Sequence, residues 1–424
     1  MAVTAQPVAE LCRAARDASR VLATLDSDTK NTALRAIADA LEARASEILE
    51  ANARDMEAGR GGGLSAALLD RLALDEGRLR GIAASVRSIA ALPDPVGEVI
   101  DGFRLPNGLD VRKVRVPLGV IAVVYEARPN VTIDAAALCL KSGNAIVLRG
   151  SSSATHSNAV LAAVAADAAE SAGVPEGAIV LVAGGGREEL AELATQNELV
   201  DLIIPRGGEG LKAALKGVAT VPVIYAASGN CHVFVDATAD LAAAEAIIVN
   251  AKTQRPGVCN AAETLLVHVD AAPAFLPRAL RVLQESGVEL RVDGRSHALA
   301  GEDLAGRLTD AADEDWDMEF LAMILAVKIV DSVKEAIDHI NTHGSGHSEA
   351  IVTSDLASAR AFEKGVDAAC VYINASTRFT DGGEFGMGAE IGNSTQKLHA
   401  RGPIALRELC TFKYVVQGDG HVRP

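Results

Sequence analysis

The sequence predicts an α/β protein that resolves into two doubly wound domains, each built on a parallel sheet, with a protruding β-hairpin arm. Short apolar runs alternate with helical segments along most of the chain, which is typical of parallel strands joined by helices. The chain has 424 residues, more than a single hydrophobic core usually organises. Hydrophobic residues make up 49% of the chain and aromatic residues 3%, a composition that suits helices packed closely on sheets.

The first segment, residues 7–95, is predicted to be helical throughout. Apolar residues recur at the spacing of one helix face, as at Leu34, Ile37 and Leu41. Three consecutive glycines at 61–63 interrupt this pattern, and the helical pattern then resumes.

A β-hairpin is predicted next, because residues 99–105 and 109–116 alternate apolar with polar side chains around Pro106-Asn107-Gly108. Asn-Gly between two alternating runs is the strongest short-range signal of a hairpin. The hairpin carries too many charges for a core, so we predict that residues 99–116 and 405–418 form an oligomerisation arm of a homo-oligomer. A solvated edge hairpin is the alternative, since exposed edges are commonly charged.

A first α/β series predicts a dinucleotide-binding domain, formed by residues 1–98 and 117–235. Glycines cluster after two of its strands, where parallel sheets bind nucleotides, but neither cluster is a G-x-G-x-x-G, and ordinary turns would explain them equally well. The strands are predicted at residues 119–125, 145–148, 178–182, 200–204 and 221–225.

A second α/β series predicts a catalytic domain at residues 236–385, followed by a return segment at 386–404. Strand-like runs recur here between helical segments, so this half of the chain has a sheet of its own. The strands are predicted at residues 232–235, 264–267, 288–292, 350–353 and 369–373, with a long apolar run at 321–330.

Charge and cysteine content exclude several classes of function. The net charge of −16 argues against a nucleic-acid partner, which would favour a basic surface. No apolar run approaches the roughly 20 residues of a membrane helix, and no basic segment with an apolar core opens the chain, so we expect no membrane association. The six cysteines lack any C-x-x-C pair, which indicates neither a metal site nor a disulfide framework and fits a cytoplasmic protein.

One cysteine, Cys259, lies on a polar loop between a helical run and a strand. Pro256 and Gly257 come just ahead of it, and this pair predicts a set turn. Lys252 and Arg255 are close in sequence, and nearby cations favour the thiolate that attacks carbonyl carbon. The alternative is a small buried hydrophobe, the usual role of a free cysteine.

Four segments, at residues 125–132, 141–145, 254–264 and 383–386, resemble the aldehyde dehydrogenase superfamily. More closely, they are similar to its branch that reduces L-glutamyl 5-phosphate in proline biosynthesis. The resemblance spans nearly the whole chain. It implies reduction of this acyl phosphate by NADPH to L-glutamate 5-semialdehyde, with release of phosphate, through a thioester on Cys259. It also implies a functional coupling to glutamate 5-kinase.

The resemblance assigns roles residue by residue. Cys259 is the implied nucleophile, and the side-chain amide of Asn130 is implied to stabilise the oxyanion together with the Cys259 N–H. Glu319 is similar to the glutamate that holds the nicotinamide ribose. A turn residue for Asn130 and a solvated acid for Glu319 are the alternatives.

The remaining assignments concern anionic groups. Arg149 and the hydroxyls after it would suit the 2′-phosphate of NADP, because arginine grips phosphate bidentately. Arginines and a lysine near the matched loops would meet the substrate's phosphate and carboxylate. The implied cofactor-binding residues are Arg149, Ser151, Ser152, Gly185, Gly186, Gly207, Gly208 and Glu319, and the substrate-binding candidates are Arg128, Lys252, Arg255 and Arg378.

One departure from the superfamily is informative. Oxidative members carry a general-base glutamate at the place matched here by Ala226-Ala227-Ser228-Gly229, where no carboxylate is present. That base activates the water that hydrolyses the thioester, so its absence favours reversible acyl transfer. A CoA-acylating aldehyde dehydrogenase, a cysteine hydrolase and a non-catalytic nucleotide-binding regulator are the competing interpretations. A requirement for inorganic phosphate would exclude the first.

Overall fold

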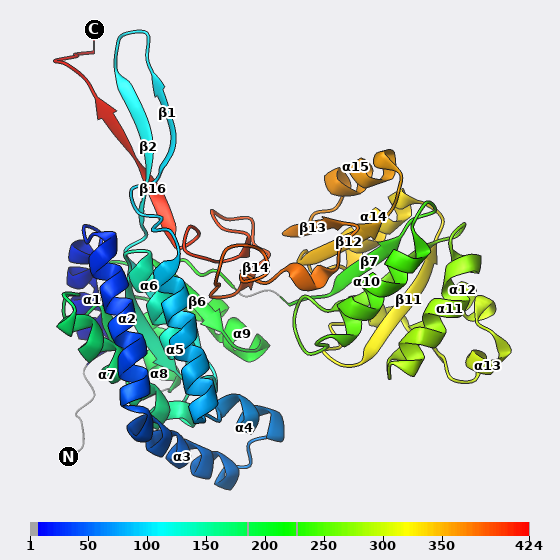
Figure 1. Cartoon of the computed structure of the whole chain (residues 1–424), viewed down its shortest axis with the longest axis horizontal. Coiled ribbons are helices and arrows are strands. Elements are labelled where there is room, and N and C mark those ends of the chain that lie inside the picture. The colour runs from blue at the N-terminus through cyan, green and yellow to red at the C-terminus, as the bar shows by residue number, and fades with distance from the viewer. Residues whose placement is uncertain (1–6, 185, 226–227, 424) are drawn as a thin grey trace. The chain divides into compact units, whose positions relative to one another are not determined.

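The structure, a computed structural model, describes residues 7–184, 186–225 and 228–423 and divides into two compact units (Figure 1). Unit 1 extends to residue 226 and also takes in residues 386–392 and 404 onward. Unit 2 comprises residues 227–385 and 393–403. Each unit has its own parallel sheet, which confirms the predicted α/β class. Within the described ranges, no helix is long and apolar enough to cross a membrane.

The predicted helices at the start of unit 1 are confirmed. Three of them begin at side-chain caps, where Asp26, Ser65 and Asp75 accept hydrogen bonds from backbone N–H groups of the first turn. α2 packs against α5, α6 and α7, so these helices form a layer outside the sheet. They are α1 (Val8–Leu22), α2 (Ser27–Ala43), α3 (Ala45–Gly61), α4 (Ala66–Leu72) and α5 (Glu76–Ala91).

The sheet of unit 1 has the strand order β5-β4-β3-β6, and all its neighbours are parallel. β3 and β4 are buried along their whole length, as expected for strands covered on both faces. The strands are β3 (Val120–Tyr125), β4 (Ala145–Gly150), β5 (Ile179–Leu181) and β6 (Leu202–Arg206), and the helices are α6 (Asn130–Lys141), η1 (Ser152–Ala154), α7 (Thr155–Ser171), α8 (Arg187–Ala194) and α9 (Glu209–Val218).

One predicted strand of this sheet, at residues 221–225, is wrong. The segment makes only an isolated parallel bridge between Val223 and Ile203. Pro222 has no N–H to donate, so the ladder beside β6 cannot extend through it.

The predicted hairpin arm is confirmed. β1 (Val99–Arg104) pairs antiparallel with β2 (Asp110–Pro117), and Gly108 takes a φ of +96° in the turn between them. β16 (Cys410–Gln417) pairs antiparallel with the other edge of β2, and the three strands project from unit 1 (Figure 1). Pairing of this arm with another subunit stays a prediction.

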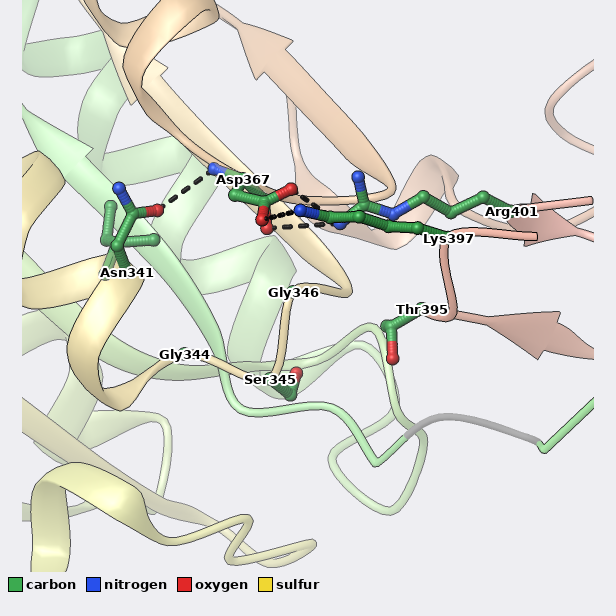
Figure 2. A pocket seen from close by; sticks show the side chains of 9 residues that line it. Asn341, Gly344, Ser345, Gly346, Asp367, Thr395, Lys397 and Arg401 are labelled. Carbon is green, nitrogen blue, oxygen red and sulfur yellow. Dashed lines mark hydrogen bonds and ion pairs between the residues drawn. The ribbon is translucent and has the colours of Figure 1, made fainter.

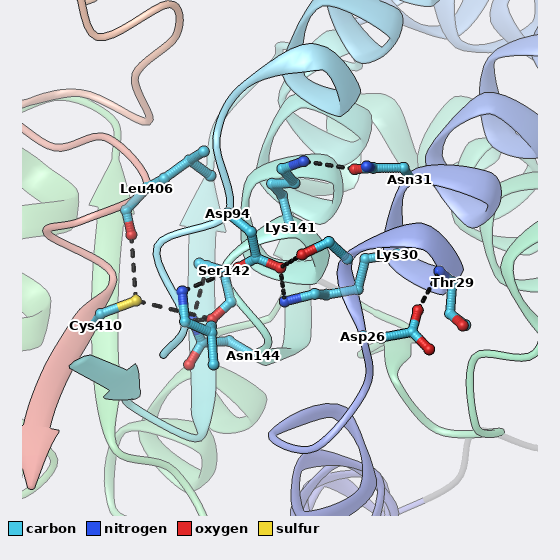
Figure 3. Close-up of polar contacts among 12 residues, drawn as sticks. Asp26, Thr29, Lys30, Asn31, Asp94, Lys141, Ser142, Asn144, Leu406 and Cys410 are labelled. Atoms are coloured by element: carbon cyan, nitrogen blue, oxygen red, sulfur yellow. Dashed lines mark hydrogen bonds and ion pairs between the residues drawn. The ribbon is translucent and has the colours of Figure 1, made fainter. Parts of the chain in front are cut away.

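The turn that joins α6 to β4 is held by a polar network (Figure 3). Asn144 Oδ1 accepts from the N–H of Gly119 at 2.8 Å, and its Nδ2 donates to Leu409 O at 2.9 Å. Lys141 Nζ donates to Ala90 O at 2.9 Å, and the buried Lys30 pairs with an Asp94 oxygen at 2.5 Å. These bonds give Lys141 and Asn144 a structural role.

The sheet of unit 2 has the order β10-β9-β11-β8-β7-β12-β13, again with parallel neighbours. Its strands are β7 (Cys231–Val235), β8 (Ala262–His268), β9 (Glu289–Val292), β10 (Thr309–Asp310), β11 (Ile324–Val330), β12 (Ser348–Val352) and β13 (Cys370–Ile373). Its helices are α10 (Leu241–Thr253), α11 (Ala272–Glu285), α12 (Gly294–Leu299), α13 (Glu302–Ala305), η2 (Asp313–Asp317), α14 (Val333–His343), α15 (Leu356–Gly365) and η3 (Thr377–Phe379). A short antiparallel pair, β14 (Asn393–Ser394) and β15 (Gly402–Pro403), completes the unit.

Alternate residues of the central strands point to opposite faces of the sheet and pack into two separate hydrophobic cores. Val233 and Val235 pack with α10 and α11, whereas Phe234 packs with α14 and α15. β7 therefore lies between β8 and β12 in unit 2. β7 is the strand predicted at residues 232–235, at the start of the second α/β series.

Candidate active site

Cys259 is the one thiol of the chain that is not buried. All six cysteines are free, and five of them lie in the interior, whereas Cys259 is half-buried. It lies in the turn between the end of α10 and the start of β8. The thiol is therefore held at the amino edge of the parallel sheet, with part of its surface exposed.

Gly229 packs directly against the Cys259 backbone. A Cβ at Gly229 would lie 1.5 Å from the Cys259 carbonyl oxygen, so only glycine fits this approach. The Gly229 N–H donates to Glu319 Oε1 at 2.6 Å, and the Cys231 thiol donates to the Cys259 carbonyl at 3.1 Å. Glu319, a predicted cofactor residue, thus binds the segment just before β7 that lies against the Cys259 backbone.

Arg378 and Asn260 tie the same loop to η3. Asn260 Nδ2 donates to Thr380 O at 2.9 Å, and the Arg378 guanidinium donates to Asn260 Oδ1 and to Gln254 Oε1. Burial lowers the pKa of Arg378, and so does the nearby charge of Arg255, whereas Cys259 raises it. Of the predicted substrate residues, Arg378 and the exposed Arg255 therefore lie beside Cys259.

Lys252 does not fit its predicted role in substrate binding. Its Nζ lies 2.5 Å from Glu263 Oε2, and both side chains are fully buried. Glu263 Oε1 also accepts from the Leu321 N–H at 3.2 Å. Burial lowers the pKa of Lys252 and raises that of Glu263 to about 7, and in each case it outweighs the attraction between the two groups. The Lys252 ammonium is therefore buried beneath the Cys259 loop, paired with Glu263, and adds no positive charge to the exposed face of that loop.

We expect the Glu263→Ala variant to lose about 3–5 kcal/mol of unfolding free energy, because it leaves the Lys252 ammonium buried without its partner. Chemical denaturation of both proteins measures this loss. The double variant Lys252→Met/Glu263→Leu, which removes both charges and keeps the volume, is the matched control and should recover most of it. A Glu263→Ala protein within about 1 kcal/mol of the wild type would contradict the expected role of this pair.

The cofactor residues predicted in unit 1 gather at the carboxyl edge of its sheet. Ser151 and Ser152 follow β4, and Gly207 and Gly208 follow β6, which are the positions where doubly wound sheets bind nucleotides. Ser152 is exposed, and the Gly208 N–H donates to Glu126 Oε2 at 3.2 Å.

Arg149 joins two of these predicted elements. Its Nη2 donates to Gly186 O at 2.6 Å, so the end of β4 and the loop after β5 are tied together. The side chain is buried, and its Nε has no hydrogen-bond partner among the described residues. Burial lowers the pKa of Arg149, against the opposing charge of Glu189. Gly185 lies outside the described residues.

Asn130 and Arg128 lie at the start of α6, at the same carboxyl edge. Asn130 is the first residue of the helix, and its Nδ2 donates to Asp134 Oδ2 at 3.0 Å. Tyr125 and Thr132 hold the first turn through a hydroxyl–hydroxyl hydrogen bond of 2.7 Å. Sequence reasoning missed Asp134, although an acceptor four residues after an asparagine on a helix is a readable signal.

A separate pocket in unit 2, of about 440 Å³, contains none of the predicted site residues. Figure 2 shows that Asp367 in this pocket contacts both Lys397 and Arg401. Asn341 Oδ1 accepts from the Asp367 N–H at 3.0 Å. The charges that line this pocket are already paired with one another.

Comparisons with known proteins agree with the predicted resemblance. The profile of the aldehyde dehydrogenase family matches residues 1–296 and 309–415. The gamma-glutamyl phosphate reductase of Heliobacterium modesticaldum is 57% identical over 409 residues, covering 96% of this chain and 97% of that protein. That of Thermobifida fusca is 54% identical over 416 residues, covering 98% of this chain and 98% of that protein.

Solved structures give the same picture. The gamma-glutamyl phosphate reductase of Thermotoga maritima matches with a TM-score of 0.95 and 45% identity, covering 99% of this chain and 100% of that chain. An acetylating aldehyde dehydrogenase from Geobacillus thermoglucosidasius matches with a TM-score of 0.68 and 20% identity, covering 98% of this chain and 97% of that chain. The second match shows a shared fold alone.

Proposed function

The chain belongs to the aldehyde dehydrogenase family and, within it, to the gamma-glutamyl phosphate reductases, and from this premise we propose how its residues carry out the reaction. The protein reduces L-glutamyl 5-phosphate to L-glutamate 5-semialdehyde in proline biosynthesis. The observation that carries the proposal is the half-buried Cys259, held on a glycine-backed loop beside Arg378.

Cys259 acts as the acyl carrier. Its thiolate attacks the acyl carbon, the bond from that carbon to the phosphate oxygen breaks, and phosphate leaves with the bonding electrons. The acyl group is then a thioester on Sγ. When bound, the nicotinamide cofactor supplies the hydride that reduces this thioester. The chain has no carboxylate at residues 226–229 to activate water, so the thioester is protected from hydrolysis.

Donors and cations of the chain stabilise the charges that form. The Asn130 amide and the Cys259 N–H donate to the oxyanion of each tetrahedral state. Arg128, Arg255 and Arg378 bind the anionic groups of the substrate.

The cofactor in this proposal is NADPH. The unpartnered Nε of the buried Arg149 supports an anionic ligand at the end of β4, where Ser151, Ser152 and the glycines of the neighbouring loops also lie. Glu319 would hold the nicotinamide ribose.

We expect the Arg149→Gln variant to lose about 10- to 100-fold in kcat/KM for NADP while its kcat/KM for NAD changes little, because a charge-assisted hydrogen bond to the 2′-phosphate is lost. Initial rates with both cofactors measure this selectivity. The control is Arg80→Gln, which replaces an exposed arginine of α5 and should leave kcat/KM for both cofactors unchanged. An equal loss with both cofactors would instead indicate a structural role for Arg149.

The decisive assay runs the reaction backwards. Pyrroline-5-carboxylate, which supplies the semialdehyde, is mixed with NADP and inorganic phosphate, and the absorbance of NADPH is followed. The rate should depend on phosphate, and CoA should not replace it. Activity with CoA alone would favour the CoA-acylating alternative, and cofactor-independent acyl hydrolysis would favour a cysteine hydrolase.

We also propose that the β1-β2-β16 arm joins copies of the chain into a homo-oligomer. Apolar side chains on these strands are exposed, among them Phe103, Tyr414 and Val416. Sedimentation of the purified protein tests this, and a monomer at micromolar concentration would refute it. A cytoplasmic location and functional coupling to glutamate 5-kinase belong to the same proposal.

A further inference from the structure

We infer that Asp134 is a positioning residue that sets the orientation of the Asn130 amide. The inference rests on the proposed function, in which that amide donates to the oxyanion. An amide presents two N–H donors on one side and a carbonyl oxygen on the other, so its value as a donor depends on which way it faces.

The hydrogen bond between the two side chains selects one orientation. Asn130 and Asp134 are four residues apart in α6, which places them on one face of the helix, and Nδ2 lies 3.0 Å from Asp134 Oδ2. An ionised carboxylate accepts but cannot donate, so it binds the N–H side of the amide and not the carbonyl oxygen. One N–H is used in this bond, and the second is left to donate to a ligand.

The surroundings make this selection sensitive to protonation. Asp134 is half-buried, and burial raises its pKa to about 6, against the opposing effects of the Asn130 hydrogen bond and the charge of Arg206. Above this pKa the group is a pure acceptor. Below it the protonated acid gains a donor that can bind Asn130 Oδ1. A flipped amide would then aim an oxygen at the developing oxyanion and oppose catalysis.

The hydrogen bonds that link Thr132, in the first turn of α6, to β3 and α7 do not provide this selection. Tyr125, Thr132 and Asn158 form a chain of neutral groups that fixes the helix start. Hydroxyl groups donate and accept alike, so they cannot discriminate between the two ends of an amide. Among the residues that the structure describes, Asp134 is the carboxylate that hydrogen-bonds to the Asn130 side chain, and when ionised it accepts only.

A double-mutant cycle in the full-length enzyme tests this inference, with Asn130→Ala, Asp134→Asn and the double variant assayed in the phosphate-dependent reverse reaction. Asn130→Ala should lower kcat about 100-fold, as expected for the loss of one oxyanion donor. Asp134→Asn, which keeps the shape but can bind either end of the amide, should lower kcat about 10-fold with little change in KM. The double variant should be no slower than Asn130→Ala, because Asp134 acts through Asn130.

The pH profile gives a second readout that a merely structural role would not move. kcat of the wild type should fall below a pH of about 6, and this limb should be absent in Asp134→Asn and in Asn130→Ala. Multiplicative losses in the double variant, or an Asp134→Asn enzyme with the wild-type rate and profile, would overturn the inference. If Asn130→Ala keeps the wild-type kcat, the proposed role of the Asn130 amide as an oxyanion donor is wrong. This single variant tests that role separately from the role of Asp134. Thermal unfolding of all variants confirms that they fold.

Discussion

Replacing Cys259 with alanine should lower kcat by at least about 10⁴-fold, because the acyl group then has no atom to occupy between loss of phosphate and reduction. The reverse assay with pyrroline-5-carboxylate, NADP and phosphate measures this loss. Folding should be retained, since the side chain is half-buried and its removal leaves the backbone bonds of the loop in place. A serine at this position should also be inactive, because its hydroxyl is far less ionised than a thiol at neutral pH.

Chemical labelling provides an independent test of the same residue. Iodoacetamide should alkylate one cysteine of the native protein, since the other five are buried, and activity should fall in step with labelling. The acyl phosphate should protect the enzyme by occupying Sγ. The buried Cys370 serves as the matched control, because its alanine variant should keep its activity and still be inactivated. A Cys259→Ala enzyme with more than about 1% of the wild-type rate would refute the thioester mechanism.

Local patterns allowed much of the fold to be predicted from the sequence. Buried parallel strands appear as continuous apolar runs, and Asn-Gly between alternating runs located the hairpin. The prediction failed at residues 221–225, where an apolar run contains a proline and makes a single bridge. The order of the strands could not be predicted locally, because β7 pairs with partners more than 25 residues away in the chain.

In the candidate site, too, features set by neighbouring residues could be predicted, whereas contacts between distant segments could not. The turn that carries Cys259 could be predicted because Pro256 and Gly257 mark it. Lys252 was misread because nearness in sequence does not fix direction, and its ammonium points into the interior toward Glu263. Gly229 approaches the Cys259 backbone from a loop 30 residues earlier in the chain. No sequence pattern near either residue predicts this contact.

Substituting alanine for Gly229 should therefore impair catalysis strongly without touching a catalytic atom. The new Cβ would lie 1.5 Å from the Cys259 carbonyl oxygen and 2.6 Å from its Cα, so the nucleophile loop must shift. A displacement of this kind can cost about 100-fold in rate, and we expect at least that loss in kcat. Overpacking should also lower the unfolding free energy by about 1–3 kcal/mol.

The control for this variant is Gly81→Ala, in the middle of α5. A Cβ at Gly81 meets no atom within 4 Å, and the residue is exposed. This substitution should leave kcat unchanged and raise stability by about 0.5–1 kcal/mol, because alanine favours the helix. Rates of iodoacetamide labelling then separate the two effects of Gly229→Ala, since a displaced loop alters labelling of Cys259 at temperatures where the protein is still folded. If Gly229→Ala keeps kcat within about threefold of the wild type, the loop tolerates displacement, and catalysis does not depend on this close backbone contact.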